Sequence, residues 1–130
     1  MERAWHEAVK RGDPARVRAL LAAGADPDAR DRFGQTGLMI AAYAGHRDVV
    51  QALVTAGARL DVVAKFGLSA LMLAIVGGHP DIARLLLGAG ADRSLRGNGA
   101  PGFARKTASD LARERGLLDL AAELAPVTGE

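Results

Sequence analysis

Three histidines are the residues of this sequence best suited to hold a metal ion or to move a proton. His46 and His79 lie 33 residues apart (79−46), and His6 stands beside Glu7 near the N-terminus. The chain has no cysteine, which excludes disulfides, thiolate metal clusters and a cysteine nucleophile. The same 33-residue step recurs elsewhere in the chain, so His46 and His79 should occupy equivalent places on neighbouring helices, about 8–10 Å apart. Zinc ligands lie about 2 Å from the ion. We therefore interpret both as loop residues and expect no metal, no cofactor and no catalysis.

A glycine-rich stretch, residues 97–107, shares only part of the phosphate-loop pattern. It ends in a Lys-Thr pair, but the Walker motif needs glycine directly before the lysine, and Arg105 stands there. We interpret the stretch as an insertion, because Ser69 and Thr107 are 38 residues apart, five more than the repeat (38−33). Two interpretations of it stay open. It is either a tolerated flexible loop or a longer finger over a binding face, with Phe103 and Arg105 at its tip.

Three aspartates recur at similar places in the chain and could suggest an acidic site: Asp48, Asp81 and Asp119. Each stands near the expected start of a helix, where a carboxylate stabilises the positive end of the helix dipole. We expect them to act one by one in this way.

An internal repeat of 33 residues organises the whole sequence. Gly24-Ala25 recurs as Gly57-Ala58 and Gly90-Ala91, Phe33-Gly34 as Phe66-Gly67, and Gly45-His46 as Gly78-His79. Within one period, small and apolar residues predict a helix over 36–44 that ends at Gly45, and a second helix from Asp48 to just before Gly57. About ten residues without helical pattern follow. Each such unit has an apolar side that only stacked neighbours can cover.

The combined motif of one period resembles the ankyrin repeat. The matching residues are Gln35-Thr36-Gly37-Leu38, Ala41-Ala42, Gly45-His46, Val49-Val50 and Gly57-Ala58. The resemblance implies an all-α solenoid of stacked helix-turn-helix units with short β-hairpin-like loops, forming a single domain over residues 1–130. Its repeats would be 1–30 as an N-terminal cap, 31–63, 64–96, and 97–127 as a C-terminal cap with a lengthened hairpin.

The sequence departs from the family pattern in two ways. The family's Pro and His of "T-P-L-H" are replaced by Gly37 and Met39, and one repeat later by Ala70 and Met72. We expect the methionines to pack in the core. In the last copy, polar Arg113 and Glu123 stand where the inner copies are apolar, as the end of a stack requires.

The resemblance implies that a partner protein binds the hairpin tips and the exposed ends of the first helices, along the concave side. Carried onto this chain, the partner-binding residues are Lys10, Arg11, Arg30, Arg32, Phe33, Gln35, Tyr43, Lys65, Phe66, Leu68, Val76 and Arg96. Six of them are basic and none is acidic, so we expect a partner with an acidic surface and an apolar anchor. Phe33 and Phe66 should form one row. The alternative is that the charges serve solubility and the two phenylalanines pack against each other.

Composition sets the broader expectations. The 130 residues carry a formal charge of +2 and contain no uninterrupted apolar stretch of the ~18 residues that would indicate a membrane span. We expect a non-catalytic protein-binding module, monomeric on its own and cytoplasmic. Its Ala- and Arg-rich composition suggests a bacterial gene, and Met1 with a polar last copy suggests a complete small protein. The alternative function is nucleic-acid binding through the same basic face, although the chain shows no nucleic-acid motif and few lysines.

Overall fold

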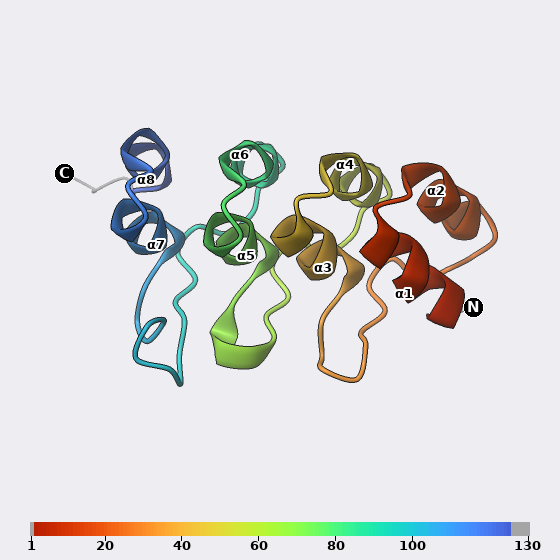
Figure 1. Cartoon of the computed structure of the whole chain (residues 1–130), viewed down its shortest axis with the longest axis horizontal. Helices are drawn as coiled ribbons and strands as arrows, with labels where there is room; N and C mark the ends of the chain where they lie inside the picture. Colours follow the sequence, from red (N-terminus) through yellow and green to blue (C-terminus); the bar gives the residue numbers. More distant parts are fainter. Residues whose placement is uncertain (1, 126–130) are drawn as a thin grey trace.

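The computed structural model describes residues 2–125, which form four successive helix pairs (Figure 1). The helices are α1 (Glu2–Arg11), α2 (Pro14–Ala22), α3 (Gly37–Ala44), α4 (Arg47–Thr55), α5 (Ala70–Val76), α6 (Pro80–Gly88), α7 (Ala108–Glu114) and α8 (Leu118–Leu124). Odd-numbered helices form one row and even-numbered helices a second, and the long loops extend from the odd-numbered row (Figure 1). This arrangement confirms the expected all-α repeat fold.

The odd-numbered helices begin at hydroxyl residues that recur along the chain. Thr36, Ser69 and Thr107 are the N-caps of α3, α5 and α7. The side-chain oxygen of each accepts a hydrogen bond from the backbone N–H three residues later, at 3.3, 3.4 and 3.3 Å. This satisfies one of the N–H groups that a helix start leaves without a partner. At the other end, α3 stops at Gly45, whose φ of 85° is the left-handed conformation that favours glycine.

The core runs along the junction between the two rows. Residues that the 33-residue period brings into register are buried together: Val17, Val50 and Ala83, and Leu20, Leu53 and Leu86. Met39 and Met72 are each 1% exposed, which confirms the expectation that they replace polar family residues with core packing. Each odd-numbered helix contacts the next one along the stack, and the even-numbered helices do the same.

One core contact explains an unusual glycine at a helix start. Gly37 begins α3, and a Cβ atom built there would lie 3.4 Å from Nε1 of Trp5 and 3.3 Å from a methyl of Val9. Trp5 is 1% exposed. The absent side chain therefore leaves room for the indole of α1 against α3.

The C-terminal end of the stack carries polar groups on α7 and α8. Arg113 and Glu123 are both exposed. Nε of Arg84, on α6, lies 2.9 Å from a carboxylate oxygen of Glu123. Three helix starts also carry the predicted carboxylate in their first turn, Asp48 in α4, Asp81 in α6 and Asp119 in α8.

Candidate functional site: the hairpin side of the helix stack

The two repeat-equivalent histidines connect neighbouring helix pairs. Nε2 of His46 donates to the backbone oxygen of Lys10 at 3.0 Å, and Nε2 of His79 donates to the backbone oxygen of Tyr43 at 3.1 Å. Each ring occupies a notch left by a glycine of the preceding pair. These histidines are structural, as the interpretation as loop residues implied.

The notches explain why glycine and histidine recur together. A Cβ at Gly12 would lie 2.6 Å from the His46 ring, and a Cβ at Gly45 would lie 2.5 Å from the His79 ring. A Cβ at Gly78 would meet nothing within 4 Å, and Leu117 stands one insertion-adjusted period after His79. Sequence reasoning identified the recurrence but missed the hydrogen bonds. The signal was the glycine one period before each histidine.

The structure distributes the predicted contact residues over three levels of exposure. Eight are exposed: Lys10, Arg11, Arg30, Arg32, Phe33, Tyr43, Lys65 and Arg96. Gln35, Phe66 and Val76 are half-buried. Leu68 is only 6% exposed, so the prediction that it contacts a partner is wrong. The turn Lys65–Gly67 has two successive residues with positive φ, Phe66 at 64° and Gly67 at 68°, and Leu68 then packs in the core.

Arg11 lies apart from the other basic residues of the set. It lines a hollow with Asp13 and Arg16 at the turn between α1 and α2. Lys10, its neighbour on α1, lines a different pocket that faces the first hairpin loop. Adjacent residues on a helix point in different directions, and here only Lys10 joins the hairpin side.

Two hairpin tips present a cation against an aromatic ring. The guanidinium of Arg32 lies 5.0 Å from the ring centroid of Phe33, and Nζ of Lys65 lies 5.0 Å from that of Phe66. This distance is within the range of cation–π attraction. The two pairs stand one repeat apart (66−33), so the same arrangement occurs on adjacent tips.

The two phenylalanines nevertheless differ in surroundings. Phe33 is 66% exposed, whereas Phe66 packs against Phe103 with ring centroids 5.6 Å apart. Phe103 comes from the lengthened loop and is itself half-buried. The prediction that Phe103 stands at an exposed tip is therefore wrong, and so is the alternative that Phe66 packs against Phe33. Phe33 is the exposed aromatic of the pair.

The lengthened loop is joined to the hairpin before it by hydrogen bonds. The backbone N–H of Asn98 donates to the oxygen of Phe66 at 2.7 Å. Within the loop, the N–H of Arg105 donates to the oxygen of Gly97 at 2.9 Å. The side chain of Arg96 donates to the backbone oxygen of Arg105 at 2.6 Å. The insertion thus folds back onto the third helix pair, with Arg105 exposed.

The acidic residues near the tips are engaged by backbone amides. A carboxylate oxygen of Asp31 accepts from the N–H groups of Phe33 and Gln35, both at 2.9 Å. Asp28 and Asp61 each accept from a backbone N–H of the next hairpin at 2.8 Å, which links successive loops. Hydrogen bonds from the side chain and backbone of Ser94 lower the pKa of Asp92 below its ordinary value.

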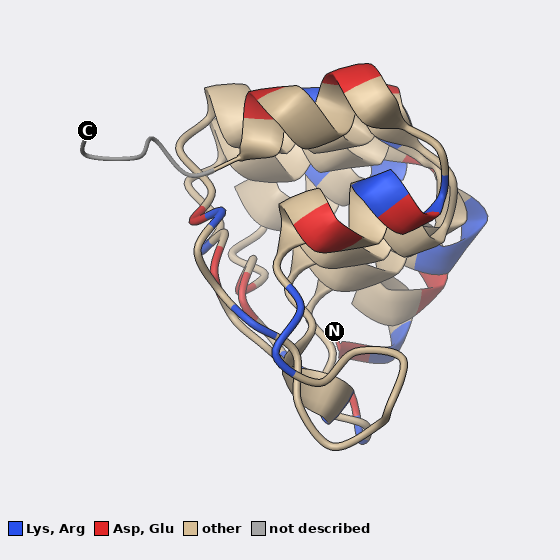
Figure 2. Cartoon of the chain, turned by 90° about the vertical axis from the view of Figure 1, so that its left-hand side faces the viewer, with Lys and Arg blue, Asp and Glu red and all other residues tan. Residues whose placement is uncertain are grey.

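The basic residues of the predicted set have no such partner. Within residues 2–125, six cations form ion pairs with carboxylates: Arg3, Arg47, Arg59, Arg84, Lys106 and Arg113. Lys10, Arg11, Arg30, Arg32, Lys65 and Arg96 are absent from these pairs. Seen from the α7–α8 end, basic positions lie on loops as well as on helices (Figure 2). The predicted set thus holds positive charge that the described part of the protein does not compensate by direct pairing.

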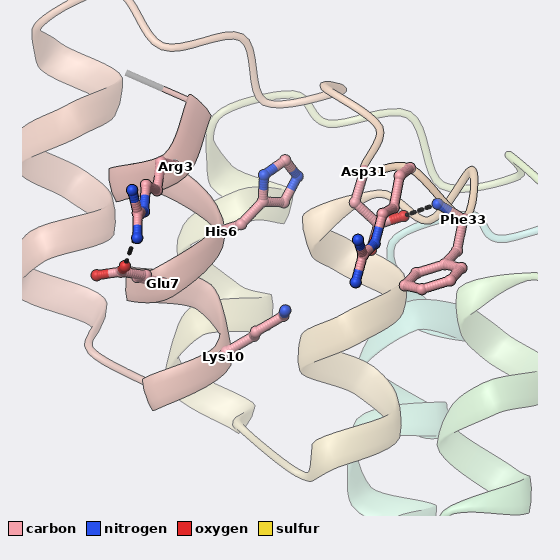
Figure 3. A pocket seen from close by; sticks show the side chains of 7 residues that line it. Arg3, His6, Glu7, Lys10, Asp31 and Phe33 are labelled. Carbon is pink, nitrogen blue, oxygen red and sulfur yellow. Dashed lines mark hydrogen bonds and ion pairs between the residues drawn. The ribbon is translucent and has the colours of Figure 1, made fainter.

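A pocket of about 610 Å³ lies between α1 and the first hairpin loop (Figure 3). Its lining residues are Arg3, His6, Glu7, Lys10, Asp31, Arg32 and Phe33. Sequence reasoning named only Lys10, Arg32 and Phe33. His6 stands one period before Met39 (39−6), and this register was the signal that it shares the inner face of the stack.

Two further searches cover the described residues. Among them, no group of three or more His, Asp or Glu side chains is arranged to hold a metal ion. None of the helices between residues 2 and 125 has both the length and the apolarity needed to cross a membrane.

Comparison with known protein families identifies the repeat. A family model for ankyrin repeats, in three copies, matches residues 5–96. This range includes α1 to α6 except the first three residues of α1, and α7 and α8 add a fourth helix pair beyond it. A search of curated proteins finds no match. The chain belongs to the ankyrin-repeat family.

Proposed function

We propose that this protein is a non-catalytic module that binds a partner protein through the hairpin side of its helix stack. Ankyrin repeats are generally protein–protein interaction modules. The observation that carries the proposal is the set of basic residues without ion pairs beside exposed aromatic side chains. Tyr43 is 55% and Phe33 66% exposed. Tyrosine and arginine are enriched among the residues that dominate binding energy at interfaces, and exposed aromatic side chains supply apolar contact area.

The contact residues that we propose are those of the predicted set that reach this surface. They are Lys10, Arg30, Arg32, Phe33, Gln35, Tyr43, Lys65, Phe66, Val76 and Arg96. Their charge favours an acidic partner surface with an apolar anchor. We further propose that the protein is monomeric on its own. The absence of cysteine is typical of proteins from a reducing compartment, which supports a cytoplasmic location.

Association kinetics with the co-purified partner test this proposal. Charges at the rim of an interface mainly set the association rate, and buried aromatic residues set dissociation. Arg32→Glu combined with Lys65→Glu should slow association and reduce its dependence on salt. Phe33→Ala should speed dissociation by about 2 kcal/mol, roughly 30-fold, if its ring is a binding hot spot. Phe66→Ala is a poorer probe because it also removes the packing on Phe103.

The matched control is Arg18→Glu, an exposed position on the outer helix α2. It reverses the same type of charge on the opposite row of helices and should change neither rate. Loss of binding in Arg18→Glu with normal binding by the tip variants would place the interface on the wrong side. Filter binding of mixed DNA and RNA tests the alternative nucleic-acid function. Retention that depends on Lys65 and Arg32 would favour it.

A further inference from the structure

We infer that the pocket between α1 and the first hairpin loop anchors a carboxylate of the partner, carried on an acidic segment with an apolar residue beside it. This inference rests on the proposed function and names the chemistry of the partner at one end of the surface. The pocket holds three cationic side chains, Arg3, Lys10 and Arg32, against two carboxylates.

Two of these cations are available to an incoming acid. Lys10 and Arg32 are exposed and take part in no ion pair among residues 2–125. Lys10 extends from α1 toward the loop that carries Asp31 and Phe33 (Figure 3). The two charges therefore come from different elements and border one pocket, which suits a carboxylate inserted between them.

The acidic groups of the pocket are already occupied. One oxygen of Asp31 accepts two backbone N–H groups, as described above. Glu7 pairs with Arg3 along α1 at 3.7 Å, with both side chains more than half exposed. Neither carboxylate forms a direct ion pair with Lys10 or Arg32 in the part of the chain that the structure covers. The pocket thus offers uncompensated positive charge.

A polar atom without a partner lies in the same wall. Nε2 of His6 is buried and has no hydrogen-bond partner among the described residues. The ring stands between α1 and the hairpin loop (Figure 3). A buried polar atom that lacks a hydrogen bond costs free energy, and a carboxylate oxygen in the pocket would supply an acceptor for it.

The rim of the pocket determines what should flank the acid. Phe33 lines the pocket and is 66% exposed, and the guanidinium of Arg32 lies against its ring. This contact orders both side chains before binding, which lowers the entropy lost on association. An aliphatic or aromatic residue next to the acid would cover the ring. The recognised segment is therefore acidic and apolar in alternation.

Nuclear magnetic resonance of the ¹⁵N-labelled full chain tests the inference. The probe is a short peptide that alternates glutamate with leucine, and the matched control peptide has glutamine in place of glutamate. The glutamate peptide should shift the amide signals of α1 and of residues 31–33. Lys10→Gln combined with Arg32→Gln should weaken its binding at least tenfold, whereas Arg18→Gln should leave it unchanged. An unchanged circular dichroism spectrum shows that the variants keep the fold.

Two results would overturn the inference. One is that the glutamine peptide shifts the same signals to the same extent. The other is that the glutamate shifts centre away from α1 and the first hairpin. Comparison with the co-purified partner separates this failure from that of the proposed function. If the partner's binding depends on Lys65 and Arg96 but not on Lys10 and Arg32, the module binds there and only the pocket inference fails. If neither pair matters, the proposed function fails too.

Discussion

At the scale of single residues, glycines set how closely neighbouring repeats approach. Gly12 and Gly45 leave notches for the rings of His46 and His79, which donate to backbone oxygens of the preceding repeat. Gly77 makes a similar approach without a positive φ, because a Cβ there would overlap the backbone oxygen of Tyr43. This oxygen is the one that accepts from His79, so the contact links spacing to hydrogen bonding.

Two glycine substitutions test this role with opposite signs. Gly77→Ala should lower the free energy of unfolding by about 1–3 kcal/mol, because backbone has to move to relieve the overlap. Gly88→Ala should raise it by about 0.5 kcal/mol, since a Cβ there meets nothing within 4 Å and alanine favours the helix. Urea unfolding of both variants measures the difference. Equal effects of the two substitutions would show that the close approach at Gly77 does not limit packing.

At the scale of elements, α7 has the most complete start of the helices described. The hydroxyl of Thr107 accepts from the N–H of Asp110, and the carboxylate of Asp110 accepts from the N–H of Thr107 at 2.9 Å. The backbone hydrogen bond from Thr107 lowers the pKa of Asp110, helped by the Thr107 hydroxyl and by Arg113. This reciprocal capping holds the helix that follows the lengthened loop.

Acid titration tests the capping pair. Because the pKa of Asp110 is lowered by folding, its stabilisation is present above the ordinary aspartate pKa of 3.8 and is lost as the pH falls through the folded value. Asp110→Ala should therefore cost about 1 kcal/mol at pH 7, and the cost should shrink near pH 3. Asp48→Ala, in the first turn of α4, removes a similar charge without a reciprocal cap and should cost less. Equal costs for both variants at pH 7 would contradict the account.

The elements also show what the sequence alone can predict. The predicted helix over 36–44 agrees with α3 because its start at Thr36 and its stop at Gly45 are local signals. Leu68 was misassigned because an apolar residue after a loop turn can face either way, and only the positive φ values of Phe66 and Gly67 settle its direction. The Phe66–Phe103 contact joins residues 37 apart (103−66), so local pattern could not reveal it.

At the scale of the whole molecule, the repeat architecture keeps one long side open. The contacts between helices join members of one pair or neighbouring pairs along each row, as in a one-dimensional stack. The loops all extend from the odd-numbered row (Figure 1). The pocket beside α1 could not be predicted from sequence, because it depends on the distance between a helix and a loop more than 20 residues later (31−10). Its cations, by contrast, were visible in the repeat register.

Site-specific photo-cross-linking tests the central claim most directly. A photoreactive phenylalanine analogue replaces Phe33 or Tyr43 on the hairpin side, and Gln51 or Arg18 on the outer helices α4 and α2. In lysate of the source cells, the first two positions should cross-link the same single protein, and the outer positions should not. Charge reversal at Arg32 and Lys65 should abolish the cross-link. Cross-linking of that protein from Gln51 or Arg18, with none from Phe33 or Tyr43, would contradict the account.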